Sequence, residues 1–390
     1  MQDTYDVAVV GGGPAGASAA LRLAKAGATV LLLEKENIPR YKTCGGGVVY
    51  RARSLIGVDI SNAVERELYV ARMGLLSGSA YFEARRSKPL ISMTMRATLD
   101  HALMLSAERA GATLQAHTEV RSLSFSGDSV NVQTANGAVT AKFIIGADGA
   151  NSTVAKCAGW KESRELIPAI ETELYLPDQQ FAALSGKARF DFDIPRRGYA
   201  WVFPKRDHLS LGVLSVTGRK VQLKAALAQY CDVIGVKRVL KEERHGFVIP
   251  VAPRRDGFAR NRVLLVGDAA GFADPVTVEG ISYAVQSGQL AADALMKAKF
   301  DVRRVSQCYE TMVSAAIAPE LKAARLLAKV IYGSPRLRTW AFGRYGSTLT
   351  GAVADIFMGE RTYYGAISNP SNYLRLLSHR NRSAETLSDR

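Results

Sequence analysis

The chain has 390 residues, of which 47% are hydrophobic and 22% are charged, and its formal net charge is +15 at pH 7. This length and composition argue against a disordered chain and allow two intergrown lobes around a sizeable core. The positive charge attracts nucleic acid, an acidic membrane surface or a phosphorylated substrate, but no nucleic-acid-binding module and no dense basic tract is recognisable. We therefore expect no nucleic-acid partner.

The cysteines and apolar runs bear on the cellular compartment. The cysteines form no CxxC pair and no Cys/His cluster, so we expect neither a disulfide framework nor a metal site. They are Cys44, Cys157, Cys231 and Cys308. The N-terminus shows no signal-peptide pattern, and no apolar run reaches the roughly 20 residues that cross a bilayer. We expect a cytoplasmic protein.

The N-terminal residues predict one complete βαβ unit. Residues 5–10 are an apolar strand run that ends in a cluster of glycines. A helical pattern follows and stops at Gly27, where a left-handed residue closes a helix cheaply. Residues 29–33 form a second apolar strand run, which ends at Glu34.

The turn between this strand and helix has the spacing Gly11-x-Gly13-x-x-Gly16. Gly11 permits the tight turn, Gly13 lets a pyrophosphate approach the backbone, and Gly16 lets the helix pack closely on the strand. The helix N-terminus offers unpaired N–H groups to the phosphates, and the Glu34 carboxylate can accept from the ribose hydroxyls. The unit predicts a non-covalently bound NAD or FAD. The candidate contacts are Gly11, Gly13, Pro14, Ala15, Gly16, Glu34 and Lys35.

The middle of the chain changes from helix to strand. Residues 96–109 form a helical pattern, and short strand runs follow over 119–134. Further along, residues 188–193 and 208–216 alternate between apolar and polar side chains, which is the period of a half-buried sheet. Val120, in the first of these strand runs, is a further candidate contact of the cofactor.

A later motif separates FAD from NAD. A buried strand run delivers Asp268 to the end of the sheet, where its carboxylate can accept from the ribityl hydroxyls of a flavin. The backbone of residues 275–281 can cover the pyrimidine side of the ring and stabilise negative charge there. This segment includes the candidate contacts Gly280 and Ile281 and leads into a helix that ends near Lys297. We therefore predict FAD as the cofactor.

The FAD motifs resemble those of the enzymes built like para-hydroxybenzoate hydroxylase. GGGPAG with its following Glu, ADGANSTV and VGDAAG cover positions 9 to about 285. Arg96 opens a helix with the R-x-x-x-D-x-x-L spacing of that superfamily. The resemblance implies that Arg96 reaches toward the flavin, and a surface salt bridge is the alternative. Asp148, in the second motif, is a candidate cofactor contact and is interpreted as a turn and cap residue.

This resemblance implies an α/β fold. It would contain a Rossmann-type FAD-binding domain, an inserted mixed β-sheet substrate domain and a helical C-terminus. We assign residues 1–163 with 255–300 to the discontinuous FAD-binding domain. Residues 164–254, with part of 68–95, are assigned to the substrate-binding sheet domain, and residues 301–390 to the helical region.

Two local features are similar to the geranylgeranyl reductases within that superfamily. Residues 39–47 (PRYKTCGGG) match their P-x-x-K-x-C-G-G-G segment, and residues 199–204 (YAWVFP) match their Y-x-W-x-F-P motif. Leu214 stands where the family has the second glycine of a following G-x-G. That family reduces isolated double bonds in prenyl chains of chlorophyll, quinone or archaeal-type lipid precursors. The candidate catalytic residues are Cys44, Gly45, Gly46, Tyr199 and Trp201.

The cysteine–glycine segment suits a position beside a flavin. Its glycines form a backbone that can approach a flat ring closely and offer N–H donors. Cys44 is also a candidate contact of the cofactor. It is either a thiol activated by Arg40 and Lys42 or a small buried hydrophobe.

The aromatic segment suits a prenyl chain. Tyr199, Trp201 and Phe203 alternate along a strand and therefore point to one face, either as a wall of the substrate site or as an ordinary aromatic core. Reduction of an alkene also needs a proton. His208 is a candidate donor, although a solvent-facing histidine is the alternative, and water or Tyr199 are other sources.

The predicted reaction is FAD-dependent saturation of C=C bonds of a prenyl chain on a lipid or diphosphate precursor. No second GxGxxG motif is present, so NAD(P)H docks transiently at the flavin or ferredoxin serves as the electron donor. A flavin monooxygenase or halogenase of the same fold is the alternative. Ala155 stands where the hydroxylase motif usually has arginine, which argues against monooxygenase-type cofactor gating. A non-catalytic FAD-containing prenyl-lipid carrier is a minor alternative.

Residues 301–350 combine cations with apolar side chains, among them Trp340. A helical stretch of this kind can lie on anionic lipid, which would make the protein peripheral on the cytoplasmic membrane face. A solvated helix packed on the protein's own core is the alternative. A polar tail follows His379.

Overall fold

The computed structural model describes residues 4–78, 80–216, 221–368 and 385–386. Most of the tail after His379 therefore lies outside the described residues. Within the described ranges, no helix is both long enough and apolar enough to cross a membrane.

The first sheet positions the nucleotide motifs. It contains β1 (Thr4–Val10), β2 (Val30–Leu33), β8 (Thr113–Gln115), β9 (Val120–Ser126), β10 (Ser129–Thr134), β11 (Gly137–Gly146), β17 (Ala259–Arg260) and β18 (Val263–Leu265). The path of strands is β17-β18-β11-β1-β2-β8, and β9 and β10 extend from β11. The four pairings from β18 to β8 are parallel. Central parallel strands are covered on both faces, which explains their nearly continuous apolar sequences.

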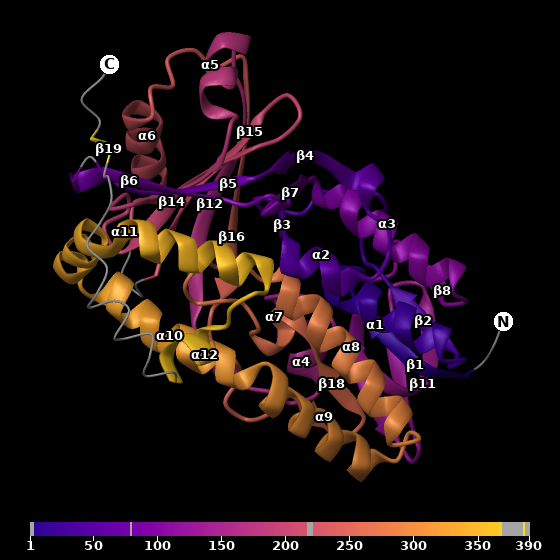
Figure 1. Ribbon diagram of the computed structural model, residues 1–390. Helices are drawn as coiled ribbons and strands as arrows, with labels where there is room; N and C mark the ends of the chain where they lie inside the picture. The colour runs from indigo at the N-terminus through magenta and orange to yellow at the C-terminus, as the bar shows by residue number, and fades with distance from the viewer. Residues whose placement is uncertain (1–3, 79, 217–220, 369–384, 387–390) are drawn as a thin grey trace.

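Helices cover this sheet and bring the motifs together. They are α1 (Pro14–Lys25), α3 (Arg96–Arg109), α4 (Thr153–Cys157), α7 (Gly267–Ala270), α8 (Ile281–Lys297) and α9 (Val302–Ala316). α1 packs on α3 and α8, as Figure 1 shows. Gly288 makes the close approach of α8 possible, because a Cβ at this position would lie 2.1 Å from the Ala15 carbonyl oxygen. The predicted boundaries of the first helix, of the helix over 96–109 and of the helix ending at Lys297 are confirmed.

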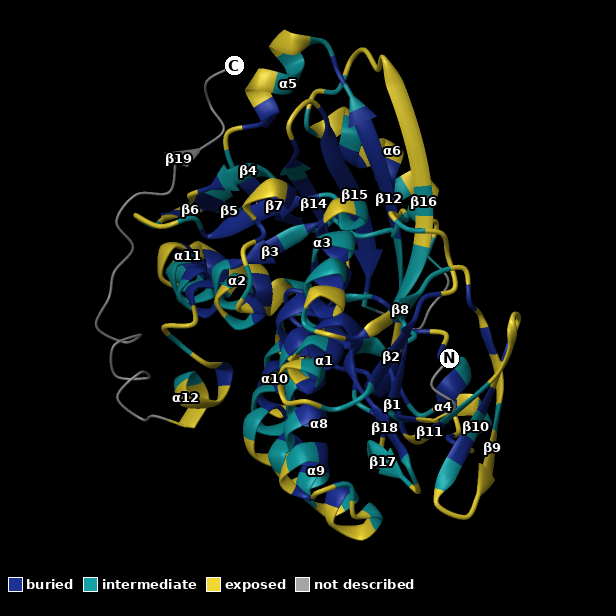
Figure 2. Ribbon diagram, turned by 90° about the vertical axis from the view of Figure 1, so that its right-hand side faces the viewer, coloured by how far each residue is buried: buried dark blue, intermediate teal, exposed yellow. Residues whose placement is uncertain are grey.

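The second sheet forms the other lobe. It contains β5 (Val70–Leu75), β6 (Ala80–Arg85), β12 (Leu166–Tyr175), β13 (Ala188–Phe192), β14 (Gly198–Pro204), β15 (Leu209–Ser215), β16 (Lys241–Pro250) and β19 (Glu385–Thr386). Their order is β16-β12-β15-β14-β13-β5-β6-β19, and the sheet is mixed because β13 and β5 are parallel. Figure 2 shows that β16, at one edge, is the exposed strand of this lobe.

The expectation of a half-buried second sheet is wrong for its central strands. β13 and β15 are buried along their whole length. One face carries the aromatic residues, and the other is covered by α6 (Leu223–Val233) beside α5 (Asp178–Leu184). Leu227 and Tyr230 of α6 pack against Val202, Leu211 and Val213. The alternation of residue types therefore separates two buried faces of the sheet, and neither face is exposed to solvent.

A small sheet and the C-terminal helices complete the fold. The sheet consists of β3 (Gly47–Val49), β4 (Val64–Leu68) and β7 (Ile91–Thr94), and α2 (Tyr50–Ile56) follows β3. The helices are α10 (Ala318–Gly333), α11 (Pro335–Met358) and α12 (Tyr363–Ser368). α11 packs on β5 and β6. The predicted α/β architecture, with a second, mixed sheet and a helical C-terminus, is confirmed.

Candidate active site

A cavity of about 480 Å³ is lined by residues of both lobes. The structure brings nearly all of the candidate site residues to this one cavity: Gly11, Gly13, Pro14, Ala15, Glu34, Lys35, Cys44, Gly45, Gly46, Arg96, Val120, Asp148, Tyr199, Trp201, Asp268, Gly280 and Ile281. Gly16 lies behind the lining, and a Cβ there would come within 1.9 Å of the Gly11 carbonyl oxygen. Gly16 therefore serves the close packing of α1 on β1.

The start of α1 is arranged to receive an anion. Gly11 has φ +106°, which favours glycine, and Gly13 is the N-cap without a capping side chain. No acidic residue lies in the first turn of α1. The first-turn N–H groups, among them that of Ala15, therefore remain available to the phosphates of a dinucleotide.

The second strand ends in a cluster of buried charges. Glu34 accepts from the Gly12 N–H at 3.0 Å and pairs with Arg40 at 3.1 Å. Arg40 also pairs with Asp100 at 2.9 Å, and Arg96 binds the same carboxylate through two hydrogen bonds of 2.8 Å. The side chain of Arg96 is only 10% exposed, so the surface salt bridge considered for it is wrong. Arg40 therefore pairs with two carboxylates, and Lys42, the other cation considered for activating the Cys44 thiol, lies over the Phe247 ring with its Nζ 3.1 Å from the centroid.

Asp268 offers acceptors at the centre of the cavity. Its carboxylate lines the cavity, while its carbonyl oxygen accepts from Arg164. Burial raises the pKa of this carboxyl, and the charges of Lys42, Arg96 and Arg164 oppose the effect. On the neighbouring segment, α8 begins after Gly280, and the Glu279 carboxylate accepts from the Ser282 N–H of its first turn at 2.7 Å. A helix N-terminus and a carboxylate at these places fit the pyrimidine ring and the ribityl hydroxyls of FAD.

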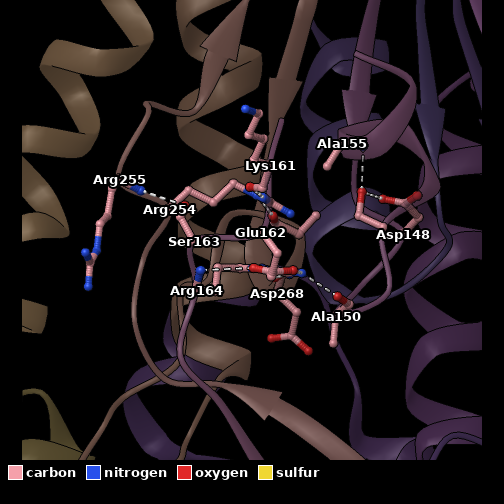
Figure 3. Close-up of polar contacts among 12 residues, drawn as sticks. Asp148, Ala150, Ala155, Lys161, Glu162, Ser163, Arg164, Arg254, Arg255 and Asp268 are labelled. Carbon is pink, nitrogen blue, oxygen red and sulfur yellow. Dashed lines mark hydrogen bonds and ion pairs between the residues drawn. The ribbon is translucent and has the colours of Figure 1, made fainter. Parts of the chain in front are cut away.

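Asp148 orders the ADG turn, and Arg164 joins this turn to the Asp268 motif (Figure 3). Asp148 accepts from the Ser152 hydroxyl at 2.6 Å and from the Val154 N–H at 2.9 Å, so it has the expected turn and cap contacts while also lining the cavity. The Arg164 guanidinium donates to the carbonyl oxygens of Ala150 and Asp268. It therefore joins the ADG turn to the Asp268 segment. Arg164 was not singled out from the sequence, because it belongs to no recognisable motif.

The cysteine–glycine loop is fixed by three parts of the chain. The Cys44 N–H donates to Glu171 at 3.0 Å, and the Gly46 N–H lies 3.4 Å from the Cys44 thiol. Lys205 donates to the Gly45 carbonyl oxygen at 2.8 Å. Gly46 has φ +70°, and a Cβ there would lie 2.0 Å from the Thr94 carbonyl oxygen, so only glycine fits this position.

The aromatic strand faces this loop. Tyr199, Trp201 and Phe203 all line the cavity, and successive ring centroids are 6.2 and 6.3 Å apart. Gly212 makes room for the indole, because a Cβ there would lie 2.2 Å from Trp201. The Tyr199 hydroxyl donates to the Thr277 carbonyl oxygen at 2.5 Å, and burial raises the pKa of this phenol well above its ordinary value. These side chains are both part of the core and the wall of the cavity.

A carboxyl group that the sequence reasoning missed lies between the loop and the aromatic wall. Glu171 is 2% exposed, lines the cavity and accepts from the Cys44 N–H and from the Ser210 hydroxyl. The Trp201 indole N–H lies 3.4 Å from the same hydroxyl. Burial, reinforced by the negative charge of Glu173, raises the pKa of Glu171 to about 7. In the sequence, Glu171 is marked only by its spacing: it stands two residues after Ala169 on β12, so both side chains point to the face that lines the cavity.

The solvent-facing interpretation of His208 is wrong. The side chain is 4% exposed, and its ring nitrogens lie 2.9 Å from a carboxylate oxygen of Glu173 and 2.8 Å from one of Asp207. Burial lowers the pKa of His208, but the hydrogen bonds to these two carboxylates outweigh burial and raise it. The ring stacks on Tyr175 and does not belong to the lining of the 480 Å³ cavity.

Comparison with known proteins agrees with the cofactor site. The family model for an FAD binding domain matches residues 4–299. The chloroplastic geranylgeranyl diphosphate reductase of Oryza sativa subsp. japonica is 32% identical over 364 residues, which cover 85% of this chain and 76% of that protein. A menaquinone reductase of Mycolicibacterium smegmatis is 26% identical, with 85% of both chains covered.

Solved structures share the fold. A geranylgeranyl bacteriochlorophyll reductase-like protein from Thermoplasma acidophilum has a TM-score of 0.76 at 23% identity and covers 97% of this chain and 96% of its own. The halogenase PltM has a TM-score of 0.72 at 17% identity, with 96% and 90% covered. The chain belongs to the geranylgeranyl reductase family of FAD-dependent oxidoreductases.

Proposed function

We propose that this protein is an FAD-dependent reductase that saturates a C=C bond of a prenyl chain carried by a lipid or a diphosphate precursor. The observation that carries the proposal is one shared cavity. The cysteine–glycine loop and the aromatic strand line the same space as Asp268 and the start of α8. The names of relatives that act on geranylgeranyl diphosphate and on menaquinone support a prenylated substrate.

The apolar side of the cavity suits a prenyl chain. Phe190, Leu214, Ile249 and Phe357 extend the lining beyond Tyr199, and they come from three strands of the second sheet and from α11. Burial of apolar surface supplies binding energy without directional contacts, which suits a long hydrocarbon. The aromatic wall would hold the alkene and exclude water from it.

Reduced FAD, when bound, supplies a hydride to one alkene carbon. The second carbon must then receive a proton, and we propose that the Glu171 carboxyl delivers it. This group is buried at the cavity, and its pKa of about 7 keeps a proton available near neutral pH. Hydride and proton together add two hydrogen atoms across the double bond, and solvent restores the proton on Glu171.

The other candidate donors are less suited. The Tyr199 phenol is buried, its hydroxyl donates to Thr277, and loss of its proton would leave a buried anion. The His208 ring lies against Glu173 and Asp207 and away from the cavity lining. A bound water remains an alternative source of the proton.

The electrons for each cycle come from NAD(P)H or from ferredoxin in this proposal. The net charge of +15 would assist the approach of an anionic nicotinamide or of an acidic ferredoxin. Assays with each donor separately distinguish them. Because charge attraction is stronger at low salt, the physiological donor should reduce the flavin faster at low salt than at high salt.

A monooxygenase or halogenase of the same fold remains the second candidate, and its supporting observation is the fold shared with the halogenase PltM. A non-catalytic carrier of prenyl lipids that contains FAD is a third, minor candidate. Product analysis under reducing conditions separates all three. The reductase yields product with two added hydrogen atoms per reduced bond, without oxygen. Product that requires oxygen and contains oxygen or halide, or no product at all, would contradict the proposal.

A further inference from the structure

A second cavity, of about 210 Å³, lies next to the first on the same face of the second sheet. Three of its lining residues lie one position beyond the ends of β14, β15 and β16, and each stands two positions from a lining residue of the first cavity. In each pair the residue of the second cavity is given first: Arg197 with Tyr199 of β14, Val216 with Leu214 of β15, and Val251 with Ile249 of β16. Side chains two residues apart on a strand point to the same face. Backbone hydrogen bonds from the Val216 N–H to the Arg197 carbonyl oxygen and from the Val251 N–H to the Glu165 carbonyl oxygen, each 2.9 Å, continue the strand pairing to these residues. The second cavity therefore lies beside the first along the same face of the sheet.

The segment that covers the first cavity also borders the second. Thr277 lines the first cavity, and Pro275 lines the second. Tyr199 bonds the Thr277 carbonyl oxygen from the sheet, while Tyr332 of α10 bonds the Val276 carbonyl oxygen from the side of the second cavity. α10 is thus coupled directly to the backbone that covers the flavin site.

The second cavity has a cationic rim. Arg197, Arg325 and Lys329 line it, and the carboxylate among its lining residues is Glu165. Glu165 pairs with Arg325 at 3.1 Å, so its charge compensates one of the three cations. Guanidinium groups bind phosphate oxygens through pairs of hydrogen bonds, and an ammonium adds a point charge. The rim therefore suits a phosphate or diphosphate group.

Apolar side chains are exposed beside this rim. Leu326 and Val330 follow directly after the rim residues Arg325 and Lys329 on α10, and Leu326 is 59% exposed. The opposite side of α10 packs into the core through Leu321, Ala324 and Ala328. Leu326 and Val330 therefore do not serve the packing of α10 on its own protein.

The next helix adds to this surface. α10 and α11 meet at the left of the molecule in Figure 1, where α11 exposes Leu337 and Trp340, the latter to 61%. Lys322, Arg336 and Arg344 are exposed cations of the same two helices. The acidic residues of residues 318–358 are Glu320, which caps α12, and Asp355, which pairs with Arg86 and Arg361. We call Leu326, Val330, Leu337 and Trp340 with these exposed cations the α10–α11 corner.

We propose that the α10–α11 corner docks on an anionic membrane and that the adjoining second cavity receives the phosphate or diphosphate head of a prenyl lipid, whose chain extends into the flavin cavity. The inference rests on the proposed function. Exposed Trp and Leu side chains enter the interface of a bilayer, and neighbouring cations attract anionic headgroups. The corner would bring the mouth of the second cavity to the membrane, so that the substrate passes from lipid to protein without crossing water.

The membrane part is tested with the full-length, FAD-loaded protein and sedimentation of vesicles. We expect binding to phosphatidylglycerol vesicles that weakens with salt, and much weaker binding to phosphatidylcholine vesicles. Trp340→Ser and Leu326→Ser should each weaken the binding, and Arg336→Gln should weaken it about fivefold. Leu240→Ser is the matched control, because Leu240 is 58% exposed beside β16 and outside the corner. Equal binding to both vesicle types, or an equal loss with Leu240→Ser, would overturn the docking.

The headgroup part is tested by binding of inorganic diphosphate to the resting protein, measured by calorimetry, and by the KM for two substrates. Arg197→Gln combined with Lys329→Gln should weaken diphosphate binding and raise the KM for geranylgeranyl diphosphate by roughly tenfold. The KM for uncharged geranylgeraniol should not change. Unchanged diphosphate binding in the double variant would overturn the site. Vesicle and diphosphate binding without turnover of any prenyl substrate would instead contradict the proposed function.

Discussion

The lobe around the first sheet, which we call the nucleotide lobe, and the second sheet, where we propose that the substrate binds and which we call the substrate sheet, differ in how their sites are built from the sequence. The glycine turn, the start of α1 and Glu34 lie within 24 consecutive residues and meet because one βαβ unit folds locally. In the substrate sheet, Glu171 contacts Cys44 across 127 positions and Ser210 across 39. The nucleotide site can therefore be predicted from a local motif, whereas the site in the substrate sheet forms only when distant strands pair. This difference predicts that the two regions fail in different ways when they are changed.

The largest expected effect is in the substrate sheet. Glu171→Gln keeps the size of the side chain and an acceptor for the Cys44 N–H, but it removes the acidic proton. We expect kcat for prenyl reduction to fall about 100- to 10,000-fold, as for loss of a general acid, while the flavin stays bound. Rapid product analysis and the flavin absorption spectrum measure the two quantities. A variant that retains wild-type kcat would remove Glu171 from the chemistry.

The second effect belongs to the nucleotide lobe and should have the opposite signature. Glu34→Gln removes the negative charge that we expect the ribose hydroxyls of FAD to meet, so we expect FAD affinity to fall about tenfold to a hundredfold. Excess FAD should restore most of the turnover. Glu108→Gln is the control, because Glu108 is exposed on α3 and does not line the cavity, so its charge is screened. Weakened FAD binding in Glu171→Gln, or normal binding in Glu34→Gln, would break the distinction between the lobes.

The smallest effect is a displacement of the pH profile. Because only the protonated Glu171 carboxyl can donate, kcat should fall as the pH rises through about 7. The negative charge of Glu173 helps to raise that pKa, so Glu173→Gln should lower the pKa of Glu171 and move the falling limb to lower pH. The rate at the acidic plateau should stay the same. A profile that does not move in Glu173→Gln would contradict the assignment of the falling limb to Glu171.

The sequence predicts the main motif-bearing elements of the nucleotide lobe. The glycine spacing, the helix over 96–109 and the strand that precedes Asp268 all follow from local patterns. The common direction of Tyr199, Trp201 and Phe203 also follows from the two-residue period of a strand. These predictions succeed because the information lies within one or two adjacent elements.

The missed features depend on contacts between distant segments. Glu171 stands in an ordinary strand sequence, and only the pairing of β12 with β15 places it beside Ser210. The alternation over residues 208–216 predicts a solvent-facing side chain for His208, but it is buried against Glu173 of β12. The sequence also predicts a solvent-exposed face for the second sheet, but α6 covers that face in the structure. Alternation along a strand identifies its two faces but not what covers each.

The central claim is that the bound flavin passes its electrons to a prenyl double bond. The most direct test is a single anaerobic half-reaction. The purified protein is reduced photochemically, freed of other reductant and mixed with geranylgeranyl diphosphate, while the flavin spectrum and the product mass are followed. The account predicts reoxidation of the flavin together with a product that has gained two hydrogen atoms. A flavin that stays reduced with every prenyl substrate tested until oxygen is admitted would contradict it.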